Sequence, residues 1–163
     1  MIEATAIVEY LAVHHAGPAP LIPPDPAEAA TARMIDRVFD NYFQHNFQRI
    51  VGAYLTDTDV GMIPKIGEPR MAEVEAGKAG LRRAYAWLEH WLGEHALPPH
   101  VSLVTCAAAP SLFYADWIER IPESCPRVRE LRAELLALPA AVRCIEDARP
   151  YRSYFPLGAP DRD

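Results

Sequence analysis

The sequence has little cysteine and no excess of basic residues, and each shortage excludes a class of protein. It contains three cysteines in 163 residues, Cys106, Cys125 and Cys144, with no Cys-x-x-Cys pair. An odd, widely spaced set predicts neither a disulfide framework nor a zinc site, and a reducing cytoplasm is the expected location. Acidic residues number 22 against 16 Lys and Arg, a net charge of −6. We expect no nucleic-acid partner, because such a partner requires clustered positive charge.

Long apolar runs and candidate metal ligands are also scarce. The longest charge-free apolar stretch, 101–115, is shorter than the ~20 residues that a membrane span needs. We therefore expect no membrane partner and interpret this stretch as a buried helix. His14 and His15 are adjacent, so they would face different sides of a helix. His90 and His95 likewise have no third ligand at suitable spacing, and we expect no metal site.

What the sequence does contain is helical periodicity interrupted by proline. The apolar residues recur at helical spacing, which predicts an all-α fold, a single helical bundle. Asp25 and Pro26 are a good N-cap and first helical residue, and Ser102 is a second N-cap. We expect a Pro-rich connector over 17–25, an irregular tail over 151–163, and helices over about 2–16, 26–55, 69–95, 102–120, 126–137 and 139–150.

Two details of the later helices can be checked against a structure. Thr105 occupies the N3 position after Ser102, where a capping box places a carboxylate or amide, so we expect this helix to be less firmly nucleated by about 1 kcal/mol. Cys106 lies on the same apolar helix and is expected to be a buried, inert thiol. Basic and acidic residues alternate further along, which predicts a solvated helix face: Arg127, Arg129, Glu130, Arg132 and Glu134.

Several segments together resemble the cytosolic glutathione transferases. Residues 2–11 resemble the end of that family's thioredoxin-like domain, where Ile-Glu-Ser, two residues and Ile precede a run ending in Tyr-Leu. The Pro-rich connector with Asp25-Pro26 resembles the inter-domain linker and the start of the long helix after it. Residues 102–110 resemble the family's buried helix, and 149–156 the tail of bacterial members. The resemblance implies a remnant of the thioredoxin-like domain at 1–16, a linker at 17–25 and the C-terminal helical bundle at 26–150.

The departures from the family pattern limit what the resemblance implies about activity. In the family, the thioredoxin-like domain supplies the catalytic Ser, Tyr or Cys, and this chain begins in the last motif of that domain. We therefore assign no catalytic residue, leave enzymatic activity undecided, and expect glutathione as a substrate of the family rather than a cofactor. Glu3 and Ala4 are a weak residual glutathione site, because Ala4 stands where the family has Ser. The lost hydroxyl costs about 1.5–3 kcal/mol of binding.

The resemblance also implies a pocket for a hydrophobic electrophile. In the family, two helices border that pocket, and the aromatic residues on the matching segments are Tyr42, Phe43, Phe113, Tyr114 and Trp117. Simple core packing is the alternative for these residues, because aromatic stripes at helical spacing usually belong to the core.

Three interpretations of the whole chain remain open from the sequence. The first is the hydrophobic-substrate side of a transferase, inactive alone. The second is a non-enzymatic helical interaction module, as in elongation factor gamma subunits and some tRNA synthetases. The third is a part of a longer or truncated gene product. We expect a homodimer or aggregation, because Ile7, Leu11, Leu21 and Ile22 would lie partly exposed without a sheet beside them.

Overall fold

The computed structural model describes residues 2–15, 17, 19–56, 65–98 and 100–163, and in these ranges it is an all-α bundle, as expected. The strands found in the described part are the two-residue β1 (Leu55–Thr56) and β2 (Lys65–Ile66), which pair antiparallel. Most of the loop expected over 56–69 lies outside the described residues. The helices are α1 (Ala4–His14), α2 (Pro26–Val38), α3 (His45–Tyr54), α4 (Met71–Glu94), α5 (Leu103–Ile118), α6 (Pro126–Leu136) and α7 (Pro139–Ala148).

The long second helix forms as expected, but with a widened turn in its middle. Asp25 caps it, since its carboxylate accepts hydrogen bonds from the N–H groups of Ala27 and Glu28, both at 2.9 Å. Between α2 and α3 lies a π-helical segment, η1 (Phe39–Gln44), and the backbone stays helical on both sides of it. Such π turns are rare in proteins, and those that occur often lie at functional sites. The chain is therefore one continuous helix from Pro26 to Tyr54.

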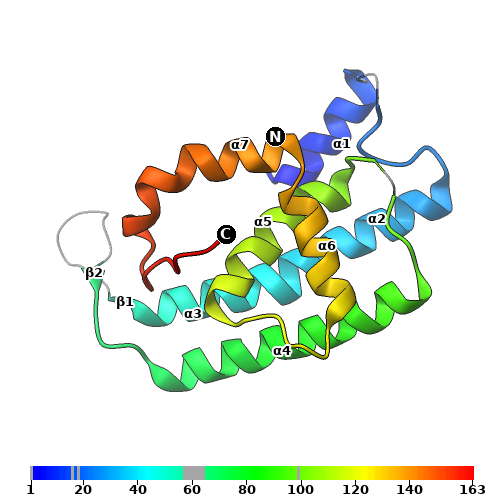
Figure 1. Ribbon diagram of the computed structural model, residues 1–163. Helices are drawn as coiled ribbons and strands as arrows, with labels where there is room; N and C mark the ends of the chain where they lie inside the picture. Colours follow the sequence, from blue (N-terminus) through cyan, green and yellow to red (C-terminus); the bar gives the residue numbers. More distant parts are fainter. Residues whose placement is uncertain (1, 16, 18, 57–64, 99) are drawn as a thin grey trace.

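The core lies where this long helix meets α4 and α5. The α3 and α4 helices pack most extensively, and α5 crosses between α2 and α6 (Figure 1). Phe43 and Tyr85 meet edge to face, 5.5 Å apart between ring centroids, a favoured aromatic geometry. The largest fully buried side chains are Tyr85, Phe39, Phe43, Ile35, Ile50, Leu81, Leu88 and Leu112.

The start of α5 has a capping box in which a hydroxyl takes the place of the carboxylate. Ser102 is fully buried, and its N–H donates to the Thr105 hydroxyl at 3.1 Å, so Thr105 fills the capping-box position without a carboxylate. The N–H of Leu103 donates to the carbonyl of Leu21 at 2.8 Å. This bond fixes the Pro-rich connector against the first turn of α5.

The first helix, α1, is the least integrated part of the bundle. It has no buried residue, and Ile7 and Leu11 are 41% and 46% exposed, which confirms the expected exposure. The Thr5 hydroxyl donates to the Asp36 carboxylate of α2 at 3.0 Å. Figure 1 shows α1 at one edge of the molecule, away from α3 and α4.

The C-terminal segment is more ordered than expected. Instead of a wholly irregular tail over 151–163, a 3₁₀ helix, η2 (Arg149–Tyr154), follows α7 directly. The reason is packing, because the side chain of Phe155 after η2 lies against aromatic rings of α3 and α5. None of the helices in the described ranges is long and apolar enough to span a membrane.

Candidate functional site

An aromatic pocket of about 370 Å³ opens where the C-terminal segment returns to α3 and α5. Side chains from η1, α3, α5, α7 and η2 line it, so the fold gathers residues more than a hundred positions apart. The aromatic members of its lining, which we call the aromatic pocket residues, are Phe47, Phe113, Tyr114, Trp117, Tyr151, Tyr154 and Phe155.

The rings of this pocket pack on one another around Phe155. Its ring lies edge to face with Trp117 at 5.3 Å and stacks on Tyr114 at 6.1 Å. Trp117 in turn lies 4.6 Å from Phe113, one turn earlier on α5. Residues three and four apart share a helix face, which explains why α5 presents these three rings together.

A few polar groups interrupt the aromatic surface. Gln44 Oε1 and Trp117 Nε1 are buried and have no hydrogen-bond partner among the described residues. The Arg152 guanidinium lies 5.3 Å from the centre of the Trp117 ring, within the range of a cation–π contact. Asp163 holds Arg152 in an ion pair. The pocket therefore combines a broad apolar surface with two unpartnered polar atoms, on Gln44 and Trp117, and the cation of Arg152.

Three of the five residues predicted for a hydrophobic pocket meet here, and two do not. Phe113, Tyr114 and Trp117 line the aromatic pocket. Phe43 does not line it, because its side chain is fully buried against Phe39 and Tyr85 in the core. Tyr42 is 58% exposed and lines none of the pockets described here. For Phe43, the core-packing alternative is correct.

Other pocket residues were missed by sequence reasoning. Phe47 continues the row of Phe39 and Phe43 at a spacing of four, a signal that was available. Phe155 gave no such signal, because the segment around it has no helical periodicity and was expected to be irregular. Gln44 and Arg152 can be assigned to the pocket only from the folded structure, because the residues around them are distant in the sequence.

The residues of the residual glutathione motif lie at the start of α1. Glu3 is the N-terminal flanking residue, with φ of 75° and ψ of 122°, and Ala4 is the first residue of the helix. Positive φ in a residue other than glycine costs about 1–3 kcal/mol and is found at ligand-binding sites. Neither residue lines the aromatic pocket. The structure therefore does not join the two parts of the predicted site.

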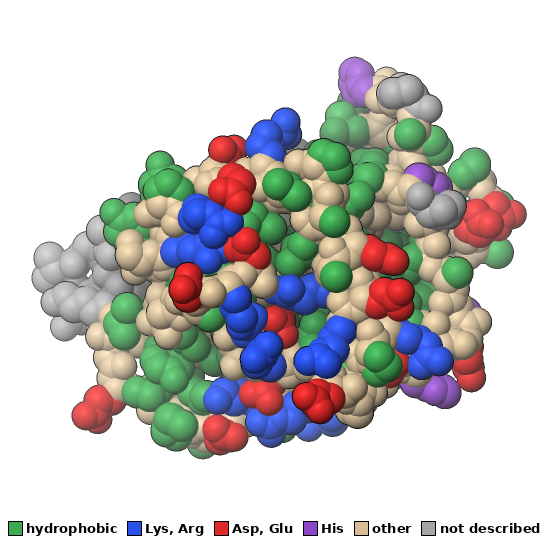
Figure 2. All heavy atoms as spheres, viewed as in Figure 1, with side chains coloured by type: hydrophobic (Ala, Val, Ile, Leu, Met, Phe, Trp, Pro, Cys, Tyr) green, Lys and Arg blue, Asp and Glu red, His purple; other side chains and the backbone are tan. Residues whose placement is uncertain are grey.

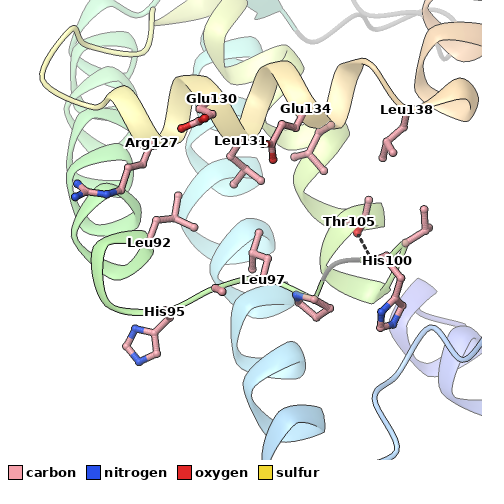
Figure 3. A pocket seen from close by; sticks show the side chains of 14 residues that line it. Leu92, His95, Leu97, His100, Thr105, Arg127, Glu130, Leu131, Glu134 and Leu138 are labelled. Carbon is pink, nitrogen blue, oxygen red and sulfur yellow. Dashed lines mark hydrogen bonds between the residues drawn. The ribbon is translucent and has the colours of Figure 1, made fainter.

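A larger pocket, about 660 Å³, lies between the end of α4, the segment after it, α5 and α6. Its polar side chains do not converge: His95 and His100 lie on one side and Glu130 and Glu134 on α6 on the other, with leucines between them (Figure 3). His95 stacks on Trp91, and its Nδ1 lies 3.1 Å from the Trp91 carbonyl oxygen. Among the described residues, no three His, Cys, Asp or Glu side chains form a candidate metal site.

A third hollow, an almost wholly apolar groove of about 580 Å³, runs between α5 and α7. Cys106 and Cys144 both line it, and both side chains are exposed. The expectation that Cys106 is buried was wrong, because α7 stands off this face of α5 and leaves it open. Although the residue as a whole is exposed, its thiol is partly desolvated by the apolar groove, and this raises the pKa of Cys106.

No family model and no curated protein matches the sequence. Solved structures do: a glutathione S-transferase from Legionella pneumophila has 19% identity and a TM-score of 0.65, over 88% of this chain and 74% of that one. A glutathione S-transferase from Methylobacterium radiotolerans, in complex with glutathione sulfonate, has 20% identity and a TM-score of 0.64, over 88% and 65%.

A maleylacetoacetate isomerase from Anaeromyxobacter dehalogenans, with bound dicarboxyethyl glutathione and citrate, has 21% identity and a TM-score of 0.64. The match covers all of this chain and 66% of that one, so the chain spans about two thirds of its length. Identities this low establish the fold and not the activity. The chain has the fold of the C-terminal helical domain of glutathione S-transferases.

Proposed function

We propose that this chain is a glutathione S-transferase-like protein whose helical bundle forms the wall of a pocket for a hydrophobic, aromatic electrophile. The observation that carries the proposal is the aromatic pocket, in which rings from α3, α5 and the C-terminal segment surround about 370 Å³ of space. Pockets of this size, mostly apolar with a few polar groups, suit small organic ligands.

The proposal includes the expectation that these 163 residues alone do not catalyse conjugation. In the family, a thiolate of glutathione attacks the electrophile, and a residue of the thioredoxin-like domain stabilises that thiolate. The strands in the described part of the chain are two residues long, so this part contains no thioredoxin-like sheet. We assign no catalytic residue, and glutathione enters the proposal only as a co-substrate whose retained contacts would be Glu3 and Ala4.

A conjugation assay tests the expected inactivity. The purified chain is mixed with glutathione and 1-chloro-2,4-dinitrobenzene, and consumption of the thiol is followed. We expect the rate to equal that of the reaction without protein. Turnover well above this background would show that the chain carries its own thiol-activating group.

A binding assay tests the pocket separately. The probe is 8-anilinonaphthalene-1-sulfonate, a planar aromatic anion whose fluorescence rises in apolar surroundings. Trp117→Leu removes a ring from the pocket and should weaken binding about tenfold, since a well-placed aromatic pair contributes about 0.5–1.5 kcal/mol beyond its buried area. Trp87→Leu is the matched control, because Trp87 is 41% exposed on α4 and does not line the pocket. Equal affinities for the two variants would reject the pocket assignment.

The groove between α5 and α7 favours a second candidate function, a helical interaction module. Its lining is almost entirely apolar, and exposed apolar patches often mark protein interfaces. Ile145 lines the groove, whereas Val142 lies on the same helix outside it and is 44% exposed. If the groove binds a partner or a second copy, Ile145→Glu should abolish the complex measured by light scattering and Val142→Glu should not. A monodisperse monomer that captures no partner would count against this candidate.

A further inference from the structure

Four arginines converge on a small pocket at the ends of α5 and α6. The pocket has a volume of about 190 Å³, and its charged lining consists of Arg120, Arg129, Arg132, Arg162, Asp116 and Asp163. Figure 2 shows basic side chains gathered on the middle of this face, with acidic ones among them. The arginines come from α6, the segment after α5 and the C-terminal segment, so the cluster exists only in the folded chain.

Four charged residues of α6 divide between two pockets, while Arg127 pairs with Glu89 of α4. Arg129 and Arg132, three residues apart, line the arginine pocket. Glu130 and Glu134 instead line the large pocket on the side facing α4 (Figure 3). The expected solvated face is present at Arg127, Arg129, Glu130 and Glu134, which are exposed, and fails only at Arg132, which is largely buried. The acids nearest in sequence do not neutralise the arginines of the pocket.

The two aspartates of the pocket are already engaged. Asp116 is buried, and one of its oxygens accepts the N–H of Ile121 at 2.9 Å while the other accepts from Arg162 at 2.5 Å. The Asp163 carboxylate pairs with Arg149 and Arg152, which lie outside this pocket. Little negative charge remains for the other arginines.

The guanidinium of Arg132 is incompletely paired as a result. Its Nε and Nη2 are buried and make no hydrogen bond with any described residue, and its closest carboxylate oxygen, on Asp116, is 3.5 Å from Nη2. Burial lowers the pKa of the Arg132 guanidinium, and Arg162 and Arg120 lower it further, although Asp116 opposes this. A buried guanidinium with incomplete pairing is costly, and an anion beside it would remove that cost.

We propose that this arginine pocket binds a phosphate group, either as the free ion or at the end of a phosphate monoester. Guanidinium groups form paired, charge-assisted hydrogen bonds with phosphate oxygens, and several arginines around one centre suit a tetrahedral dianion. The volume lies below the 300–1,000 Å³ typical of pockets for drug-sized molecules, which favours a small anion. The site is separate from the aromatic pocket and does not depend on the proposed function.

Calorimetric titration of the intact chain with inorganic phosphate, at constant ionic strength set with chloride, tests the proposal. We expect saturable binding, and we expect Arg129→Gln to weaken it about tenfold, as loss of a hydrogen bond to a charged group does. Arg143→Gln is the matched control, because it removes the same charge from an exposed position on α7 outside the pocket. It should bind phosphate as the unsubstituted chain does.

Further variants and ligands complete the test. Arg132→Gln should abolish binding if it folds, and Arg129, which is exposed, provides the result if Arg132→Gln does not fold. Glycerol 2-phosphate distinguishes the two sources, since comparable affinity identifies a monoester site and failure to bind identifies a site for the free ion. The proposal is wrong if phosphate gives no saturable signal beyond chloride, or if Arg129→Gln and Arg143→Gln weaken binding equally.

Discussion

Gly77 on α4 sits against Ile50 on α3, at the most extensive helix contact of the bundle. A Cβ at Gly77 would lie 2.5 Å from Cγ1 of Ile50 and 3.1 Å from the carbonyl oxygen of Asn46. Ile50 is fully buried and branched at Cβ, so it has no open space into which it can move. The close approach of the two helices therefore depends on the absence of a side chain at this position.

Gly77→Ala should lower the free energy of unfolding by about 1–3 kcal/mol, the usual cost of overpacking a core. Gly52→Ala is the matched substitution, because a Cβ at Gly52 meets nothing within 4 Å. Alanine in an open helical position should stabilise by about 0.5–1 kcal/mol. Urea unfolding of both variants measures the difference, and stabilisation by Gly77→Ala would contradict the packing argument.

Cys106 offers a second residue-scale prediction, this time on pH dependence. Its raised pKa favours the neutral thiol, and only the thiolate reacts with iodoacetamide. We expect alkylation at pH 7 to be slower than that of N-acetylcysteine and to continue rising above about pH 8.5, the ordinary cysteine pKa. Peptide mass spectrometry separates Cys106 from Cys125 and Cys144. A rate that levels off below pH 8.5 would show that the groove does not suppress ionisation.

At the scale of elements, the α5 helix shows how a substituted capping residue can keep its role. Thr105 offers a hydroxyl where a capping box has a carboxylate or amide, and the bond from the Ser102 N–H is made nonetheless. The hydroxyl supplies the acceptor but no negative charge. A carboxylate there would also interact with the positive end of the helix dipole.

Thr105→Ala should destabilise the chain by about 1 kcal/mol, because the buried N–H of Ser102 loses its acceptor. Thr105→Asp should stabilise it relative to the unsubstituted chain by about 0.3–1 kcal/mol above the pKa of the new carboxyl. Thermal and urea unfolding at pH 7 measure both changes. If Thr105→Asp were as unstable as Thr105→Ala, the capping bond would not be the property that matters.

At the scale of the whole molecule, the helices differ in how much of their surface is buried in the core. The α3, α4 and α5 helices share the buried core, whereas α1 has no buried residue and makes polar contacts with α2. Asp36 is the buried centre of those contacts, since it accepts hydrogen bonds from Thr5 and from Arg37. Local unfolding should therefore begin at α1.

Amide hydrogen exchange should show lower protection over 4–14 than over 71–94. Asp36→Asn should speed exchange in α1 further, because it removes the charge from the buried anchor. Glu9→Gln is the control, since the Glu9–Arg33 pair is exposed and such pairs contribute little. Equal protection in α1 and α4, or equal effects of the two variants, would contradict this description.

The sequence by itself determined the helices and most of their ends. The caps at Asp25 and Ser102, the prolines at 26, 126 and 139, and the apolar spacing of α4 act over a few residues, so they can be read without a fold. The family resemblance predicted the bundle, and the structural neighbours confirm the fold.

Only the tertiary structure decided which side chains face a common space. Phe155 contacts Trp117, 38 positions away in the sequence, and Arg162 donates a hydrogen bond to Asp116, 46 positions away. Periodicity could not distinguish Phe43 in the core from Phe113 in a pocket, because both satisfy the same helical spacing. It could not show that α7 leaves Cys106 exposed, or that Arg129 and Arg132 of α6 line a different pocket from Glu130 and Glu134. These outcomes depend on how helices pack against one another, and that information is not contained in any one helix.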